Sequence, residues 1–195
     1  MILEGIVTTS DAAGDLNVAP MGPIVDESLT SLLLRPFQSS TTYRNLQRQP
    51  YGVLHVVDDV LLLAEAAIGQ PAQTPTTFEA LTIPGRVLAS ACRWYEFQVE
   101  RLDDSQARTE IRATVTHSGR LRDVFGFNRA KHAVIEAAIL ATRVHLPNSG
   151  DVSSQYESLR TIVEKTAGPR ESQAFELLQR YVDSRMKETG DGVAN

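Results

Sequence analysis

The residues best suited to bind a ligand or do chemistry lie between Arg35 and Leu46, where hydroxyl and guanidinium side chains are concentrated. Two arginines, Arg35 and Arg44, flank four consecutive hydroxyl residues, Ser39, Ser40, Thr41 and Thr42. Hydroxyls donate single hydrogen bonds, a guanidinium donates two in a fork, and the first amides of a helix also point at an anion. This set of groups therefore suits a phosphate. The same residues are ordinary helix N-caps, so a capped helix with a solvated Arg44 is the alternative interpretation.

A second candidate ligand-binding segment is Leu16 to Met21, which predicts a strand paired with Ile2 to Thr9 across a turn at Asp11 to Asp15. Pro20, Gly22 and Pro23 end this strand. Proline at a strand end is confined to edges and bulges, where backbone groups are left free of the sheet's hydrogen bonds. We therefore expect Asn17 and the backbone around Ala19 to be available to a ligand.

The stronger enzymatic signatures are absent from the sequence. It contains no G-x-G-x-x-G before a helix, no P-loop, no G-x-S-x-G and no H-E-x-x-H. Because the four histidines are scattered, no metal site is predicted. Asp58 and Asp59 are interpreted as a helix cap and not as an acid pair. The single cysteine, Cys92, lies among small and apolar residues and is expected to be a buried structural thiol.

The elements that must position these residues are mostly strands. Apolar runs at 31–34 and 53–57 predict strands on either side of the hydroxyl-rich loop, with a short helix at 42–49 that Pro50 ends. Residues 60–68 predict a helix, and the proline-rich residues 71–84 predict a long surface connection. Alternating residues at 89–102 and 107–116 predict the clearest hairpin.

The apolar spacing changes to a helical period at Asn128, which is a good N-cap. It predicts a helix to Arg143, a break at Pro147 to Gly150, a second helix capped by Asp151 or Ser153, and a third helix over 170–187. Strands followed by helices indicate an α+β fold. The third helix carries an apolar stripe, Phe175, Leu178, Tyr181, Val182 and Met186, which we expect to be covered within its own subunit.

Composition excludes several functional classes. The chain has 195 residues, 42% of them hydrophobic and 22% charged, as in soluble globular proteins. Its net charge of −5 argues against nucleic-acid binding, which needs clustered Lys and Arg. No apolar run approaches the roughly 20 residues that cross a membrane. With no signal-peptide pattern at the N-terminus and a single cysteine, a cytoplasmic location is expected.

Motifs across most of the chain up to Arg143 resemble a family of uncharacterised, mostly prokaryotic proteins with the flavin-reductase-like, FMN-binding split-barrel fold. They are E-G-I-V-T-T, N-V-A-P-M-G, L-L-L-R-P-F-Q-S-S-T-T-Y-R-N-L, V-L-H-V-V-D-D and N-R-A-K-H-A-V-I-E-A-A-I-L-A-T-R. The resemblance implies a six-stranded Greek-key split β-barrel at 1–125 and a helical segment at 126–195 packed on it. It also implies a homodimer with one FMN per subunit near the dimer interface.

The resemblance further implies which residues bind the cofactor. The family's N-x-A-P motif falls on Asn17, Ala19 and Pro20, where the strand's backbone lies near the flavin ring. Its arginine and hydroxyl cluster falls on Arg35, Ser39, Ser40, Thr41 and Thr42, and Asn45 closes the segment. This division agrees with the chemistry, because the polar cluster suits a phosphate and a proline-interrupted strand suits a flat ring.

The expected function is therefore that of an FMN-binding flavoprotein, an oxidoreductase of flavin-reductase type with an unknown substrate. None of the matched positions is an obvious catalytic acid or base, although flavin chemistry belongs to the cofactor. The alternative is a non-enzymatic split-barrel dimer that acts as a binding or accessory protein. The resemblance also suggests a third interpretation, a role in a pterin-dependent one-carbon pathway.

Overall fold

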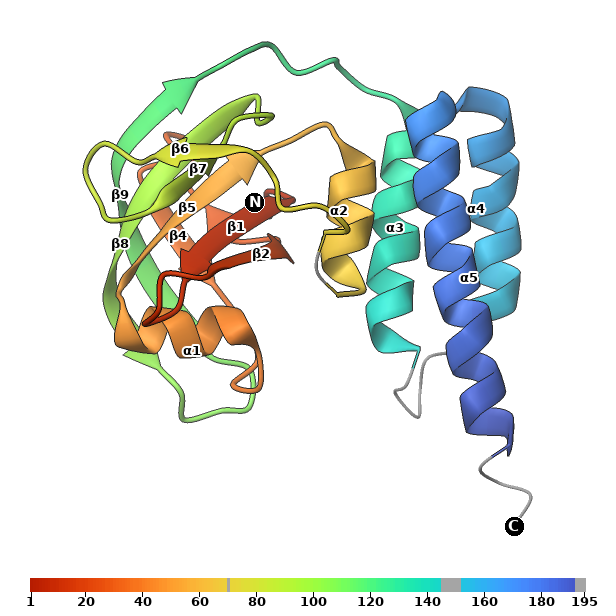
Figure 1. The fold of residues 1–195 in the computed structure, drawn as a ribbon, viewed down its shortest axis with the longest axis horizontal. Coiled ribbons are helices and arrows are strands. Elements are labelled where there is room, and N and C mark those ends of the chain that lie inside the picture. The colour runs from red at the N-terminus through yellow and green to blue at the C-terminus, as the bar shows by residue number, and fades with distance from the viewer. Residues whose placement is uncertain (70, 145–151, 192–195) are drawn as a thin grey trace. The chain divides into compact units, whose positions relative to one another are not determined.

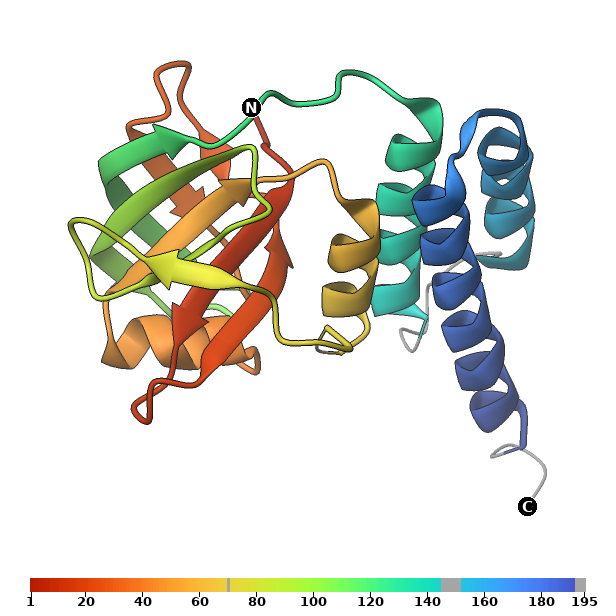
Figure 2. The same ribbon diagram turned by 45° about the horizontal axis from the view of Figure 1, so that its top comes forward.

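The computed structural model describes residues 1–69, 71–144 and 152–191, and two compact units make it up. The first contains Met1–Asp58 and Gln73–Val124, and the second contains Asp59–Ala72 and Phe125–Asn195. The predicted break at 147–150, the candidate cap Asp151 and His145 lie outside the described residues. Figures 1 and 2 show the elements of each unit.

The first unit is built on an antiparallel sheet of seven strands in the order β2-β1-β5-β8-β9-β4-β3. The strands are β1 (Gly5–Ser10), β2 (Leu16–Met21), β3 (Ile24–Val25), β4 (Ser31–Leu34), β5 (Tyr51–Val56), β8 (Arg93–Asp103) and β9 (Glu110–Arg120). Helix α1 (Thr41–Arg48) lies between β4 and β5 in the chain. The predicted α+β class and the hairpins β1–β2 and β8–β9 are confirmed.

The sheet curls into a half-barrel (Figure 1). The segment leading into β1 thereby meets the edge strand β3. Ile2 forms an isolated bridge with Ile24, and the Leu3 amide donates to the Pro23 carbonyl at 3.0 Å. Two register shifts in the β8–β9 ladder, at Glu96/Phe97 and Val99/Arg101, mark bulges that bend the strands. The sheet has seven strands and not the six expected, because the two-residue strand β3 forms directly after Pro23, where the sequence predicted only the end of β2.

A small hairpin corrects the prediction of an irregular connection at 71–84. Strands β6 (Thr77–Glu79) and β7 (Arg86–Leu88) pair there, and apolar side chains of this segment bury Val53 and Trp94 in a cluster with Ile83 and Val87. Tertiary packing thus overrides the proline-rich local signal. Gly119 of β9 lies under the Trp94 ring, where a Cβ atom would stand 2.0 Å from the nearest ring carbon. Only glycine fits there.

The main core of the first unit fills the inside of the curled sheet. Its members are Val7, Val25, Leu32, Leu34, Tyr43, Leu46, Leu54, Tyr95, Phe97, Ile111 and Ala113. Helix α1 contributes Tyr43 and Leu46, which face the core on successive turns. Because these side chains are buried, the position of α1 is fixed, and with it the preceding loop that holds the hydroxyl residues.

The second unit is a bundle of helices α2 (Val60–Ala67), α3 (Arg129–Arg143), α4 (Val152–Thr166) and α5 (Pro169–Asp191). Asp59 caps α2 and Asn128 caps α3, as predicted. Helix α2 belongs to this unit, although the predicted domain boundary at residue 125 placed it in the barrel domain. The reason is that α2 contacts α3 and α5, and its apolar residues find their partners there.

The apolar stripe of α5 is largely covered inside the helical unit. Phe175, Leu178 and Val182 are buried, Tyr181 is half-buried, and only Met186, at 42%, is exposed. The Tyr156 hydroxyl of α4 donates to the Ala137 carbonyl of α3 at 2.7 Å. No helix in the described part of the chain is long and apolar enough to cross a membrane.

Candidate functional site

The hydroxyl-rich loop ends in the N-terminus of α1. Ser40 has extended backbone angles, and its side chain accepts a hydrogen bond from the Tyr43 amide at 3.1 Å, so Ser40 is the N-cap. Thr41 and Ser39 are exposed beside it. The capped helix of the alternative interpretation is therefore present, and it also gathers hydroxyls and helix amides at one place.

Arg44 is exposed but not simply solvated. Its Nη1 donates to the Ser39 carbonyl at 2.7 Å, and its Nη2 donates to Thr41 Oγ1 at 3.0 Å. The guanidinium therefore braces the turn that precedes α1.

Arg35 stands at the end of β4 and is half-buried. No hydrogen bond or ion pair engages its guanidinium within the described ranges, whereas its carbonyl accepts from Arg108 Nε at 3.1 Å. The turn of the β8–β9 hairpin holds this loop at further points, since the Thr109 amide donates to the Pro36 carbonyl and the Gln38 amide donates to the Ala107 carbonyl. The loop backbone is thus fixed while the Arg35 head group has its donors available for a ligand.

The predicted residues Asn17, Thr42 and Asn45 meet in a buried polar network. Asn17 Nδ2 donates to Thr42 Oγ1 at 3.1 Å and to Thr9 Oγ1 at 3.2 Å, and Asn45 Nδ2 donates to Thr9 Oγ1 at 3.1 Å. All four side chains are at most 6% exposed. Sequence reasoning missed Thr9, although the predicted hairpin register would have set it opposite Asn17.

Ala19 and Pro20 lie half-buried in β2, opposite Val7 and Ile6 of β1. Strand β2 is an edge strand, with β1 as its one neighbour in the described sheet. Proline is tolerated at an edge because a missing N–H breaks no ladder there. The position predicted to face a ligand is therefore at a sheet edge.

Two buried titratable groups lie outside this cluster and serve the fold. His55 is fully buried, with its Nδ1 3.1 Å from the Ile6 carbonyl and its Nε2 accepting from the Leu88 amide at 3.0 Å. These partners fix the tautomer with the proton on Nδ1. Burial outweighs the Ile6 hydrogen bond and lowers the pKa of His55 to about 4, so the ring is neutral near pH 7.

Glu96 is a buried carboxylate that ties the β6–β7 segment to β8. Its Oε1 accepts from the Leu81 amide at 2.9 Å and from Trp94 Nε1 at 3.1 Å, and its Oε2 accepts from the Thr82 amide and hydroxyl at 2.7 Å. Burial raises the pKa of Glu96, but these hydrogen bonds together outweigh it and hold the pKa below its usual value. The carboxylate is satisfied, so it is an anchor and not a free acid or base.

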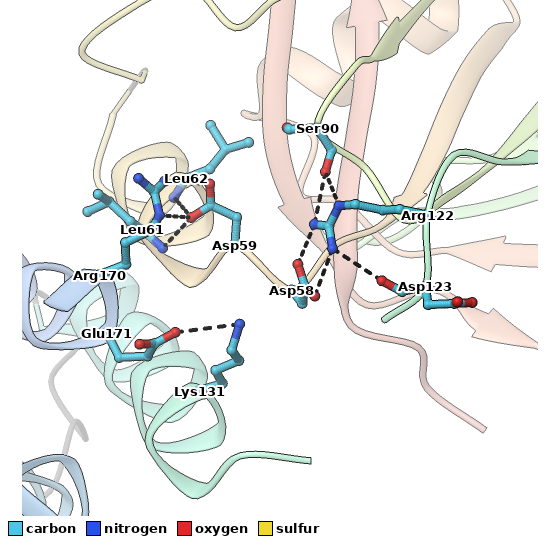
Figure 3. Close-up of polar contacts among 10 residues, drawn as sticks. All are labelled: Asp58, Asp59, Leu61, Leu62, Ser90, Arg122, Asp123, Lys131, Arg170 and Glu171. Atoms are coloured by element: carbon cyan, nitrogen blue, oxygen red, sulfur yellow. Dashed lines mark hydrogen bonds and ion pairs between the residues drawn. The ribbon is translucent and has the colours of Figure 1, made fainter. Parts of the chain in front are cut away.

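Asp58 and Asp59 do not form an acid pair (Figure 3). Asp58 binds the Arg122 guanidinium through both oxygens, within the first unit. Asp59 accepts from the Leu61 and Leu62 amides at the start of α2 and binds Arg170 within the second unit. The prediction of a helix cap is confirmed for Asp59.

Other candidate sites are weaker. A pocket among Arg101, Asp103, Glu110 and Arg112 encloses about 100 Å³, well below the roughly 300 Å³ or more typical of small-molecule sites. Across the described ranges, no three His, Cys, Asp or Glu side chains gather in a way that could hold a metal ion. The capped start of α1, with its hydroxyls and first helix amides, is the arrangement best suited to an anionic ligand.

Two family models match the chain. One is described as the N-terminal domain of a protein of unknown function, DUF447, and covers residues 3–122. The other, described as a protein of unknown function, DUF447, covers residues 128–180. Among curated proteins, none matches the chain.

Solved structures with a similar fold include an FMN-bound DUF447 protein from Methanosarcina mazei, at 22% identity and a TM-score of 0.79. That match covers 92% of this chain and 94% of the other. An FMN-binding protein from Thermus thermophilus matches at 10% identity and a TM-score of 0.53, over 60% of this chain and 70% of its own. Component B of nitrilotriacetate monooxygenase from Bacillus cereus matches at 20% identity and 0.51, over 62% and 69%. At these identities the structures establish the fold, and the family models, which match residues 3–122 and 128–180, establish that the chain belongs to the DUF447 family.

Proposed function

We propose that this protein is an FMN-binding flavoprotein. The observation that carries the proposal is the hydrogen bond from Asn17 Nδ2 to Thr42 Oγ1, 3.1 Å long and joining residues 25 apart in sequence. It joins the strand expected to face the ring to the helix expected to bind the phosphate. The FMN that the Methanosarcina mazei relative holds supports the same assignment.

The residues at the site fit this cofactor. Arg35, Ser39, Ser40 and Thr41 would hold the phosphate, because the guanidinium is uncommitted within the described ranges and the hydroxyls surround the α1 N-terminus. Ala19 and Pro20 would lie against the ring at the edge of β2. We assign the curled sheet to the FMN-binding split-barrel type with Greek-key connections.

We further propose that the protein is an oxidoreductase of flavin-reductase type. Bound FMN would supply the redox chemistry, and the chain would bind and orient the cofactor and leave room for a second substrate. We also propose that it works as a homodimer in the cytoplasm. Light scattering of the purified protein tests the dimer, and cell fractionation tests the location.

An accessory binding protein is the second candidate, and one observation favours it. None of the nine proposed cofactor residues is a carboxylate, histidine or cysteine, and the buried acid Glu96 and base His55 are both held by structural hydrogen bonds. A split-barrel dimer that binds flavin without turnover would need no such group.

The decisive experiment begins with the colour of the purified protein. Absorbance in the flavin bands, or quenching of FMN fluorescence when FMN is added to the stripped protein, supports the cofactor assignment. Protein that is colourless and takes up no FMN would refute it. If FMN binds, oxidation of NADH or NADPH with added electron acceptors separates the enzyme from the accessory protein.

A further inference from the structure

We infer that Thr9 is a positioning residue that couples the strand facing the flavin ring to the helix binding its phosphate. The inference rests on the proposed function and deepens it. It divides the predicted site residues into those that touch the ligand and those that hold the touching residues in place.

The network closes on itself through Thr9. Thr9 Oγ1 accepts from Asn17 Nδ2 of β2 at 3.2 Å and from Asn45 Nδ2 of α1 at 3.1 Å. Asn17 Nδ2 also reaches Thr42 Oγ1, one turn before Asn45 on the same helix. The Thr9 hydroxyl on β1 therefore adds a second link between the edge strand and the helix, beside the direct bond from Asn17 to Thr42.

Burial makes this link hard to replace. Thr9 is 4% exposed and Asn45 is 3% exposed, so water has little access to supply a substitute acceptor. Removing the hydroxyl takes away the one acceptor that the structure gives Asn45 Nδ2. A buried amide donor without a partner costs free energy, and a small shift of α1 that gives Asn45 another acceptor would relieve that cost.

A shift of α1 would act at the phosphate end of the site. Ser40 and Thr41 begin the same helix, and Asn45 lies about one turn further along it. Their hydroxyls and the first amides would then move relative to β2, on which the ring would lie. We therefore assign Asn17, Thr42 and Asn45, with Thr9, to holding the site, and Arg35, Ser39, Ser40 and Thr41 to touching the phosphate.

The test compares dissociation constants for FMN and riboflavin, which differ only in the phosphate. Their ratio in each variant measures the phosphate contribution. A loss of folded protein reduces both apparent affinities by the same factor, so a purely structural effect leaves the ratio unchanged. Thr9→Val removes the hydroxyl at nearly constant side-chain shape. We expect the ratio of the riboflavin dissociation constant to the FMN dissociation constant to fall about tenfold, equivalent to one lost hydrogen bond. Thr9→Ser should restore it.

Thr8→Val is the matched control. Thr8 is the neighbouring residue of β1, 1% exposed, and its hydroxyl donates to the Arg86 carbonyl at 2.7 Å, away from α1. Its loss should destabilise the protein and leave the ratio as in the wild type. If Thr9→Val does not fold, Asn45→Ala cuts the same link from the helix side and should lower the ratio too.

The outcomes are separable. A wild-type protein that binds neither flavin overturns the proposed function, and equal wild-type affinities for the two flavins overturn the phosphate site. A wild type that prefers FMN, with the same ratio in Thr9→Val or Asn45→Ala, overturns the positioning role alone.

Discussion

Lowering the pH should destabilise the first unit through His55, which is the one completely buried histidine among the described residues. Its pKa falls from 6.5 to about 4 on folding, chiefly because burial disfavours the charged ring. Well above pH 6.5 the ring is neutral in both the folded and the unfolded chain, so its titration does not change the free energy of unfolding. Between pH 6.5 and pH 4 the unfolded chain binds a proton that the folded protein does not bind, and the free energy of unfolding falls.

The magnitude follows from the two pKa values. At about 1.4 kcal/mol per pH unit, the contribution of His55 falls by about 2 kcal/mol between pH 7.5 and pH 5, and by about 3 kcal/mol at pH 4. The assay is urea unfolding of the wild type and of His55→Asn across this range. The asparagine amide can still donate to the Ile6 carbonyl but does not titrate.

The variant should be less stable at pH 7.5, because it loses the acceptor for the Leu88 amide. The difference between the two proteins should then shrink by about 2 kcal/mol at pH 5. Parallel pH profiles for the wild type and His55→Asn would refute the reasoning, because carboxylates elsewhere affect both proteins equally.

Three further predictions concern the cofactor site, the anchor and the helical unit. Arg35→Ala should weaken FMN binding about tenfold or more in a fluorescence titration, through loss of a charge-assisted fork, whereas Arg48→Ala, at the last turn of α1, should bind as the wild type does. Glu96→Gln should lower the free energy of unfolding by about 1–3 kcal/mol, because an amide cannot accept all four hydrogen bonds that the carboxylate accepts; unchanged urea midpoints would contradict this. Removing residues 170–195 should expose the apolar partners of Phe175 and Leu178, raise the binding of a hydrophobic dye and reduce solubility. Light scattering and FMN titration should still find a dimer that binds FMN. A soluble monomer would show that the terminal helix makes the dimer contact.

Local signals predicted the elements whose causes are local. The caps Asp59 and Asn128 and the hairpins β1–β2 and β8–β9 follow from short stretches of sequence, and the structure has them where expected. Strand β3 and the hairpin β6–β7 have no such signal, since two or three residues flanked by proline form a strand only when a neighbour supplies the ladder. Helix α2 is apolar on nearly every side, so its pattern marks no face and could not tell which unit it joins.

The candidate site divides in the same way. Residue types alone indicated the hydroxyl cluster and Asn17, but not what each side chain binds. Arg44 braces the loop and Thr42 faces inward, because α1 turns its Thr42, Asn45 and Leu46 side toward the sheet. Thr9 and Glu96 were missed because a hydroxyl in one strand and a carboxylate in another gain their roles only from partners far away in sequence.

Helix α1 is held from three directions by the protein itself. The buried network binds the helix to β1 and β2, Gln49 Nε2 donates to the Asp11 carbonyl in the β1–β2 turn at 2.9 Å, and the Tyr43 hydroxyl donates to Asp104 of the β8–β9 turn at 2.8 Å. Ordering a loop when a ligand binds costs conformational entropy, and a loop already fixed by the fold avoids that cost. A short helix that sits on hairpins at both ends can therefore present its amides and hydroxyls to an anion with little rearrangement. The same tethering makes the site sensitive to changes at buried residues such as Thr9, which never touch the ligand.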